Sequence, residues 1–191
     1  MFEDLGQVFI VLFQEIESGR IVEGNEDGVI GDADIAVDSP LGVAVIPYER
    51  GGIALLDLAS GVFTDLLAAE QAIAAGAAIV DADQHRAYVL AGQALAEVDL
   101  EARQVTRWIP FAPPRDFHAG RMALAASCGK AYVACQTLAE VNLENGEWEL
   151  IADVGQCPAA VAHVPGLGAL YAARGEQLYS SYHRCDPGEG R

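Results

Sequence analysis

A seven-residue segment that returns after 43 residues constrains the fold of this chain more than any other feature. Residues 95–101 read LAEVDLE and residues 138–144 read LAEVNLE. Weaker copies lie upstream in steps of 42 residues, as IALLDLASG at 53–61 and LFQEIESG at 12–19. Each copy alternates apolar with polar or small residues and then breaks at a turn, which is the pattern of a strand entering a hairpin. A period of 42–43 residues predicts structural units that stack on one another.

Further apolar stretches accompany each copy. AYVL at 87–90 returns as AYVA at 131–134 and, less well, as ALYA at 169–172. Small-residue stretches precede these segments, and stretches containing Trp108 or Trp148 follow the repeat core. Four short strands in about 40 to 45 residues predict a four-stranded antiparallel β-propeller blade. The small residues suit a crowded inner strand, and the tryptophans suit the outermost strand, where neighbouring blades diverge.

The units predict an all-β fold, with residues 1–191 forming one β-propeller domain of about four blades. The blade parts are expected at residues 8–24, 29–67, 77–111, 120–154 and 157–183. The first part contains only the last two strands of a blade, and the last part contains the first two or three strands of another. Two outcomes stay open. Either the N-terminal and C-terminal strands complete one shared blade and close a small ring, or the propeller is incomplete and belongs to a larger one or pairs with a partner.

One segment departs from the repeat. Residues 65–75 are rich in strong helix formers, and Gly76 stands where a helix C-cap is expected. This pattern predicts a short helix in the connection between two blades. The alternative is an outer strand that runs into an alanine-rich loop.

A family resemblance rests on GQCPAAVAH at 155–163 and on the tyrosine-valine pairs at 88–89 and 132–133. These segments resemble YVTN-type β-propeller repeats (NHL or quinoprotein amine dehydrogenase-like), which open with glycine-x-x-proline and continue to tyrosine-valine. The usual threonine-asparagine does not follow the pair here. The resemblance implies a propeller and leaves the function open, because one fold hosts many functions.

Charge argues against a nucleic-acid partner. The 28 acidic residues outnumber the 11 basic ones and give a formal charge of −17, which repels a polyanion. No apolar run approaches the roughly 18 residues of a transmembrane helix, so no membrane partner is expected. Glu3 and Asp4 stand where a signal peptide needs positive charge. The sequence as written therefore predicts a cytoplasmic protein, with export still open if an upstream segment is missing.

The four cysteines, Cys128, Cys135, Cys157 and Cys185, lack the spacing of a zinc or haem motif. Cys128 and Cys135 flank a Gly-Lys turn, so a disulfide across a hairpin is one interpretation. Small buried thiols are the favoured one.

The sharpest polar constellation follows two prolines in a connection between blades and reads RDFHAGR. Asp116 orienting His118 between Arg115 and Arg121 is an arrangement that can hold an anion or act as a base. The alternative is a solvated loop. His163 lies in a predicted inner strand, where it either faces the channel as a ligand residue or serves a structural role.

Carboxylates gather at two places. Asp32 and Asp34 form one candidate metal site, and Asp81 and Asp83 form another, because closely spaced carboxylates can share Ca²⁺. Ordinary turn chemistry explains the same residues.

No serine-hydrolase, zincin, phosphate-loop or dinucleotide motif is present in the sequence. The sequence therefore predicts a non-catalytic scaffold or binding module, without a cofactor, that presents inter-blade loops to a protein or small ligand or self-associates through unpaired blade edges. The alternative is a propeller enzyme or enzyme subunit, either a lactonase-like hydrolase or the scaffold of a quinoprotein dehydrogenase.

Overall fold

The computed structural model describes residues 35–48, 52–67, 75–92, 94–111, 121–134, 137–153, 160–164, 169–174 and 177–182. These residues form strands β1 to β15 and one short 3-10 helix, so the predicted all-β fold is confirmed. In this part of the chain, no helix is long and apolar enough to cross a membrane.

The strands form four antiparallel sheets in chain order. The first sheet contains β1 (Ala36–Asp38), β2 (Val43–Tyr48), β3 (Gly52–Asp57) and β4 (Phe63–Asp65). The second contains β5 (Ala75–Asp81), β6 (Arg86–Ala91), β7 (Ala94–Asp99) and β8 (Gln104–Pro110). The third contains β9 (Arg121–Ala125), β10 (Lys130–Ala134), β11 (Thr137–Asn142) and β12 (Trp148–Asp153), with helix η3 (Ala126–Cys128) between β9 and β10. The fourth contains β13 (Ala160–Val164), β14 (Ala169–Arg174) and β15 (Gln177–Tyr182).

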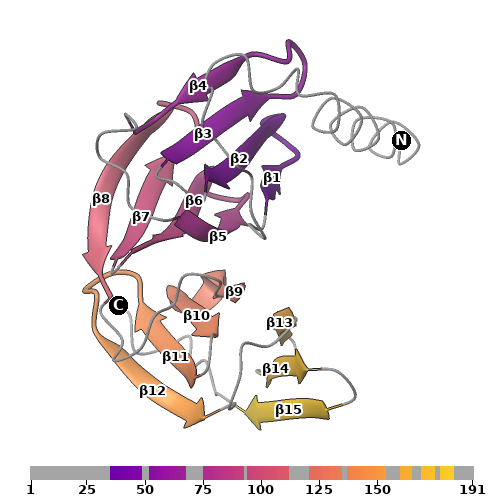
Figure 1. Ribbon diagram of the computed structural model, residues 1–191, viewed down its shortest axis with the longest axis vertical. Coiled ribbons are helices and arrows are strands. Elements are labelled where there is room, and N and C mark those ends of the chain that lie inside the picture. The colour runs from indigo at the N-terminus through magenta and orange to yellow at the C-terminus, as the bar shows by residue number, and fades with distance from the viewer. Residues whose placement is uncertain are drawn as a thin grey trace.

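Each strand pairs with the next strand along the chain, as the repeat predicts. Figure 1 shows the sheets following one another, with β5, β9 and β13 on the inner side and β4, β8 and β12 on the outer side. Inner strands of successive sheets are direct neighbours, since β5 lies against β1, β2 and β9, and β9 lies against β13. Alanine and glycine allow this close approach, and they occupy much of β5 and β9. The predicted piece at 8–24 lies outside the described residues, and the single-domain assignment stays a prediction.

Apolar side chains fill the spaces between the sheets. Val43, Val45, Ile53 and Leu55 of the first sheet pack against a set from the second that comprises Ala87, Val89, Ala96, Val98 and Leu100. The opposite face of the second sheet presents Tyr88, Leu90 and Leu95 to Ala131, Val133, Ala139, Val141 and Leu143 of the third. Tyr132, Ala134 and Leu138 then meet Leu170 of the fourth sheet. The core is therefore a series of seams between sheets, and the second and third sheets bury both faces as their strand alternation requires.

The same turn ends the third strand of each complete sheet. Side-chain oxygens of Asp57, Asp99 and Asn142 accept hydrogen bonds from backbone N–H groups two or three residues on. The turn then passes through a left-handed residue, which is Gly61 (φ 70°), Arg103 (φ 52°) or Gly146 (φ 78°). The repeated aspartate or asparagine therefore caps a turn, which is the local role expected of these residue types.

The repeat copies predict Leu58, Leu100 and Leu143 at equivalent, buried positions of the third strand, and the strand placement is wrong by one residue. Leu58, Leu100 and Leu143 each directly follow the strand, in the turn. Their N–H groups donate to the carbonyls of Gly42, His85 and Gly129 at 2.9, 3.0 and 2.8 Å. Leu100 and Leu143 are buried as predicted, whereas Leu58 is only partly buried.

Two other local predictions need correction. Gly76 lies inside β5, at a register shift between Ala75 and Ala77, so it is not a helix C-cap. Glycine suits such a bulge because it lacks a Cβ. Asp65 belongs to β4 and Ala75 to β5, so both ends of the predicted helix are strand, and residues 68–74 lie outside the described part.

The two tryptophans lie on β8 and β12, the fourth strands of consecutive sheets, as predicted. Their registers differ by two positions, because Trp108 pairs with Ala96 whereas Trp148 pairs with Val141. Trp148 is 36% exposed and packs edge-on against Phe111, with ring centroids 5.5 Å apart. Trp108 is 40% exposed.

Replacing Gly146 with alanine is expected to cost about 1–3 kcal/mol of unfolding free energy, the range for a residue held in an unfavourable backbone region. A Cβ at this position would also meet Ile109 Cγ2 at 3.3 Å across the seam. Gly61→Ala is the matched control, since it has the same left-handed φ but nothing within 4 Å. Urea unfolding should show a larger loss for Gly146→Ala, and equal losses would contradict the close contact.

Candidate functional site

The seam between the first and second sheets is held by two charged contacts. His85 Nδ1 lies 2.8 Å from Asp38 Oδ2, and Arg103 Nη2 donates to Asp57 Oδ2 at 2.7 Å. Asp38 is fully buried, so its carboxylate depends on His85 and on the Leu41 N–H group that also donates to it. The left-handed residues His85 (φ 50°) and Arg103 (φ 52°) stand in turns whose counterparts in other sheets use glycine. These two side chains therefore connect neighbouring sheets from positions where the backbone alone would favour glycine.

Neighbouring groups shift the pKa values of Asp57 and His85. Backbone N–H donation from Ser60, followed by the Arg103 guanidinium, lowers the pKa of Asp57 to about 2. The hydrogen bond that the His85 ring donates to the Asp38 carboxylate raises the pKa of His85 above 6.5, against a smaller opposing effect of desolvation. Both shifts favour the charged forms that join the sheets.

The candidate metal residue Asp81 has a turn-forming role. It is buried at the end of β5, and its Oδ1 accepts backbone N–H groups of Asp83 and Gln84 at 3.2 and 3.3 Å. Asp38 does the same for Leu41 at the equivalent turn of the first sheet. Asp83 is exposed, and Asp32 and Asp34 lie outside the described residues. Within the described ranges, no group of three or more histidine, cysteine, aspartate or glutamate side chains is placed to hold a metal ion.

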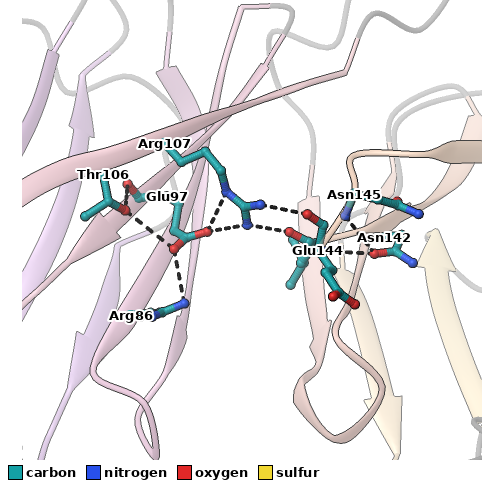
Figure 2. A network of polar contacts seen from close by, with 8 residues as sticks. Arg86, Glu97, Thr106, Arg107, Asn142, Glu144 and Asn145 are labelled. Carbon is teal, nitrogen blue, oxygen red and sulfur yellow. Dashed lines mark hydrogen bonds and ion pairs between the residues drawn. The ribbon is translucent and has the colours of Figure 1, made fainter. Parts of the chain in front are cut away.

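The seam between the second and third sheets contains a buried carboxylate that the sequence analysis did not single out. Glu97 on β7 is 6% exposed and accepts Arg107 Nη2 at 2.6 Å and Arg86 Nη1 at 3.2 Å. Arg107 also reaches the third sheet, donating to the carbonyls of Leu143 at 2.5 Å and Glu144 at 2.7 Å. Figure 2 shows Arg107 spanning from Glu97 to this turn. One guanidinium thus satisfies a buried carboxylate and fastens two sheets together.

The third sheet repeats the pattern with different residues. Glu140 on β11 is buried and pairs with Lys130, and Tyr132 lies opposite it on β10, as Tyr88 lies opposite Glu97. Burial, and then the charge of Glu140, raises the pKa of Tyr132. The phenol therefore stays neutral at physiological pH.

His163 meets this polar pair from the fourth sheet. It lies on β13, and its ring stacks on Tyr132 with centroids 5.8 Å apart. Burial lowers the pKa of His163, and the nearby Leu124 backbone opposes that shift. Among the described residues, neither ring nitrogen has a hydrogen-bond partner of good geometry. His163 thus belongs to the seam between the third and fourth sheets.

The predicted anion site falls only partly within the structure. Arg115, Asp116 and His118 lie outside the described residues. Arg121 is the first residue of β9, where it pairs with Ala134 and is partly buried. The structure therefore does not test whether these four side chains converge.

His85 and His163 are expected to change the pH dependence of stability in opposite directions. The raised pKa of His85 supplies stability below pH 6.5 that is lost as pH rises through its folded-state value. The lowered pKa of His163 removes stability as pH falls from 6.5 through its folded-state value. His85→Asn, which tolerates the left-handed backbone, should flatten the upper limb of the profile, and His163→Gln should flatten the lower limb. Urea midpoints from pH 5 to 8.5 measure both, and unchanged limbs would contradict the assignments.

The comparisons with known proteins bear on the fold. The chain matches the Kuenenia stuttgartiensis hydrazine synthase structure with a TM-score of 0.59 and 18% identity, covering 78% of this chain and 44% of that one. It matches the nidogen/laminin complex with a TM-score of 0.60 and 11% identity, covering 82% of this chain and 62% of that one. It matches the computationally designed Ika4 protein with a TM-score of 0.59 and 12% identity, covering 82% of this chain and 94% of that one.

These matches, together with the four-stranded antiparallel sheets, decide the architecture. The sheets are β-propeller blades. At these low identities the likeness concerns the fold alone. No protein-family model and no curated protein matches the chain. The chain spans less than half of the hydrazine synthase chain and under two thirds of the nidogen/laminin chain.

Proposed function

We propose that this chain is a non-catalytic propeller of the YVTN type, a binding module that presents inter-blade loops to a protein or a small anionic ligand. The supporting observation is how the described blades use their polar side chains. Glu97 and Arg107 join the second blade to the third, and Asp38 and His85 join the first to the second. Such side chains serve the scaffold, which leaves the connections between blades as the natural place for recognition.

The connection between the second and third blades is the leading candidate. Both of its ends are fixed by the scaffold, because Phe111 is fully buried in the seam and Arg121 begins β9. Between them the sequence supplies Arg115, Asp116 and His118. Two arginines and a histidine suit an anionic group, because guanidinium donors match the geometry of carboxylate and phosphate oxygens.

Trp148 provides a reporter for this connection because it packs against Phe111 at its start. Titration with inorganic phosphate should give a saturable change in tryptophan fluorescence that is absent in Arg115→Ala and in Trp148→Phe. Arg103→Ala, in the other seam, is the matched control and should respond like the wild type. No saturable response in the wild-type protein, with sodium chloride matched for ionic strength, would reject the anion-binding loop.

A propeller enzyme is the competing outcome. Metal analysis of the purified protein separates the two, since a stoichiometric divalent ion held by carboxylates would favour the hydrolase alternative. The proposed non-catalytic module binds no such ion.

We also propose that the fourth blade offers a pairing edge. Among the described residues it has three strands. Its third strand, β15, corresponds to the strand that pairs with a fourth strand in each of the other blades. An open strand edge presents backbone donors and acceptors that can pair with another strand. The N-terminal segment of this chain and a second copy are the two candidate partners.

A further inference from the structure

Cys128 lies at the end of η3, in the turn from β9 to β10, and it is disulfide-bonded. The expectation of a free buried thiol is therefore wrong for this residue. The sequence offers three partners, Cys135, Cys157 and Cys185, all outside the described residues. We infer that the partner is Cys185, so that the chain beyond the fourth blade is tied covalently to the third.

The inference rests on which rim of the blades each cysteine adjoins. Rim 1 is the edge of the blades that contains the turns between first and second strands. Rim 2 is the opposite edge, which contains the connections from one blade to the next. In the third blade, Lys130 pairs with Ala125 at rim 1, and Ala134 pairs with Arg121 at rim 2. Cys128 follows Ala125 in the turn, so it belongs to rim 1.

In the sequence, Cys135 directly follows Ala134, which lies at rim 2, the rim opposite Cys128. Strand β10 has five residues, which separate its ends by about 13 Å at 3.3 Å per residue. Disulfide-bonded cysteines have Cα atoms within about 7 Å of each other. The hairpin pairing of Cys128 with Cys135 therefore does not fit the strand geometry.

In the sequence, Cys157 stands between two strand ends that lie at rim 2. It lies in the connection from Asp153, which pairs with Thr137, to Ala160, which pairs with Ala173. All four of these paired residues stand at the rim 2 ends of their strands. To bring Cys157 to Cys128, the three-residue segment before Ala160 would have to extend from rim 2 along the full length of an inner strand to rim 1.

In the sequence, Cys185 follows the strand that ends at rim 1 of the fourth blade. It follows Tyr182 by three residues, Tyr182 pairs with Ala169, and Ala169 pairs with Val164. These three residues mark the rim 1 end of the fourth blade. Cys128 itself packs in the seam with Val161 and Leu170, so it faces that blade. Of the three candidates, Cys185 is thus the cysteine that the sequence attaches to the same rim as Cys128 and to the neighbouring blade.

Formation of this bond is a two-electron oxidation. The Cys128 and Cys185 thiols lose two protons and two electrons as one Sγ–Sγ bond forms, and a small disulfide oxidant such as oxidised glutathione is reduced to two thiols. The bond closes a loop that contains the rest of the third blade and all described strands of the fourth. It therefore restrains the blade that has three described strands.

Tryptic peptide mapping tests the assignment directly. The full chain is oxidised with glutathione disulfide, blocked with N-ethylmaleimide at acidic pH and digested without reduction. Cleavage at arginine and lysine places Cys128 in peptide 122–130 and Cys185 in peptide 185–191, while Cys135 and Cys157 share peptide 131–174. The inference predicts a 122–130 to 185–191 cross-link. A cross-link between 122–130 and 131–174, or a blocked Cys128, would overturn it.

Thermal unfolding gives an independent readout. Cys128→Ser and Cys185→Ser should each lower the Tm of the oxidised protein by about 5–15 °C, and the double variant should lower it no further. Cys157→Ser is the matched control and should leave the link intact. If Cys185→Ser unfolds like the wild type while Cys128→Ser does not, Cys128 has another partner.

Discussion

Replacing Leu100 with alanine is expected to lower the free energy of unfolding by about 2–5 kcal/mol, the usual loss for a buried leucine. Leu100 is 1% exposed and packs in the seam between the first and second blades. Its N–H group donates to the carbonyl of His85, so the surrounding turn is fixed and has little freedom to collapse into the cavity. Urea unfolding monitored by circular dichroism measures the change.

Leu58→Ala is the matched control, because Leu58 occupies the same turn position in the first blade. Its side chain is only partly buried, at the edge of a smaller cluster with Ala44, Ile46 and Leu56. The loss should therefore be clearly smaller than for Leu100→Ala. Equal losses at the two positions would show that burial in the seam does not set the stability of the repeat.

Phe111→Ala is expected to cost about 3–5 kcal/mol, because a buried aromatic side chain is removed from the middle of a seam. Phe111 is fully buried just after β8, among residues of the second and third blades. Its loss should loosen the contact between these blades. Chemical unfolding measures the cost, and a variant as stable as the wild type would contradict this placement.

The partner ring supplies a finer test. Phe111 and Trp148 meet edge to face, and such pairs contribute about 0.5–1.5 kcal/mol beyond area burial. A double-mutant cycle of Phe111→Leu and Trp148→Leu should return a coupling energy of that size. Additive losses would mean that the two rings do not stabilise each other across the seam between the blades.

The repeat made the blades predictable. The alternation of apolar and polar residues around Glu97 and its counterpart Glu140 located the third strands. The segments AYVL and AYVA located the second strands. Strand alternation and turn residues are local signals, so one sequence carries them. The leucine at position 100 was placed one residue off because a strand end and its turn share the same pattern.

Features that depend on contacts between blades were not predictable in the same way. Arg107 looks like an ordinary exposed charge on an outer strand, yet it bonds to Glu97 and to carbonyls of the next blade. A glutamate conserved between two repeat copies in an otherwise apolar strand, opposite a tyrosine, was the signal that could have revealed it. Gly76 was misassigned because alanine-rich composition favours a helix, whereas packing of inner strands selects the same small residues. Cys128 gave no local sign of which cysteine it bonds to, because positions on the same rim of neighbouring blades lie close together only in the folded chain.

Amide hydrogen exchange across β15 tests most directly the account of this chain as a set of four-stranded blades. The third strands β7 and β11 each have a neighbouring strand on both sides, so their amide groups on either side are hydrogen-bonded and should exchange slowly. If β15 is the third strand of a blade that another strand completes, its amides pointing away from β14 should also exchange slowly. Protection at every concentration would identify the N-terminal segment as the partner, and protection only at high concentration would identify a second copy. Fast exchange of those amides at all concentrations would contradict the account.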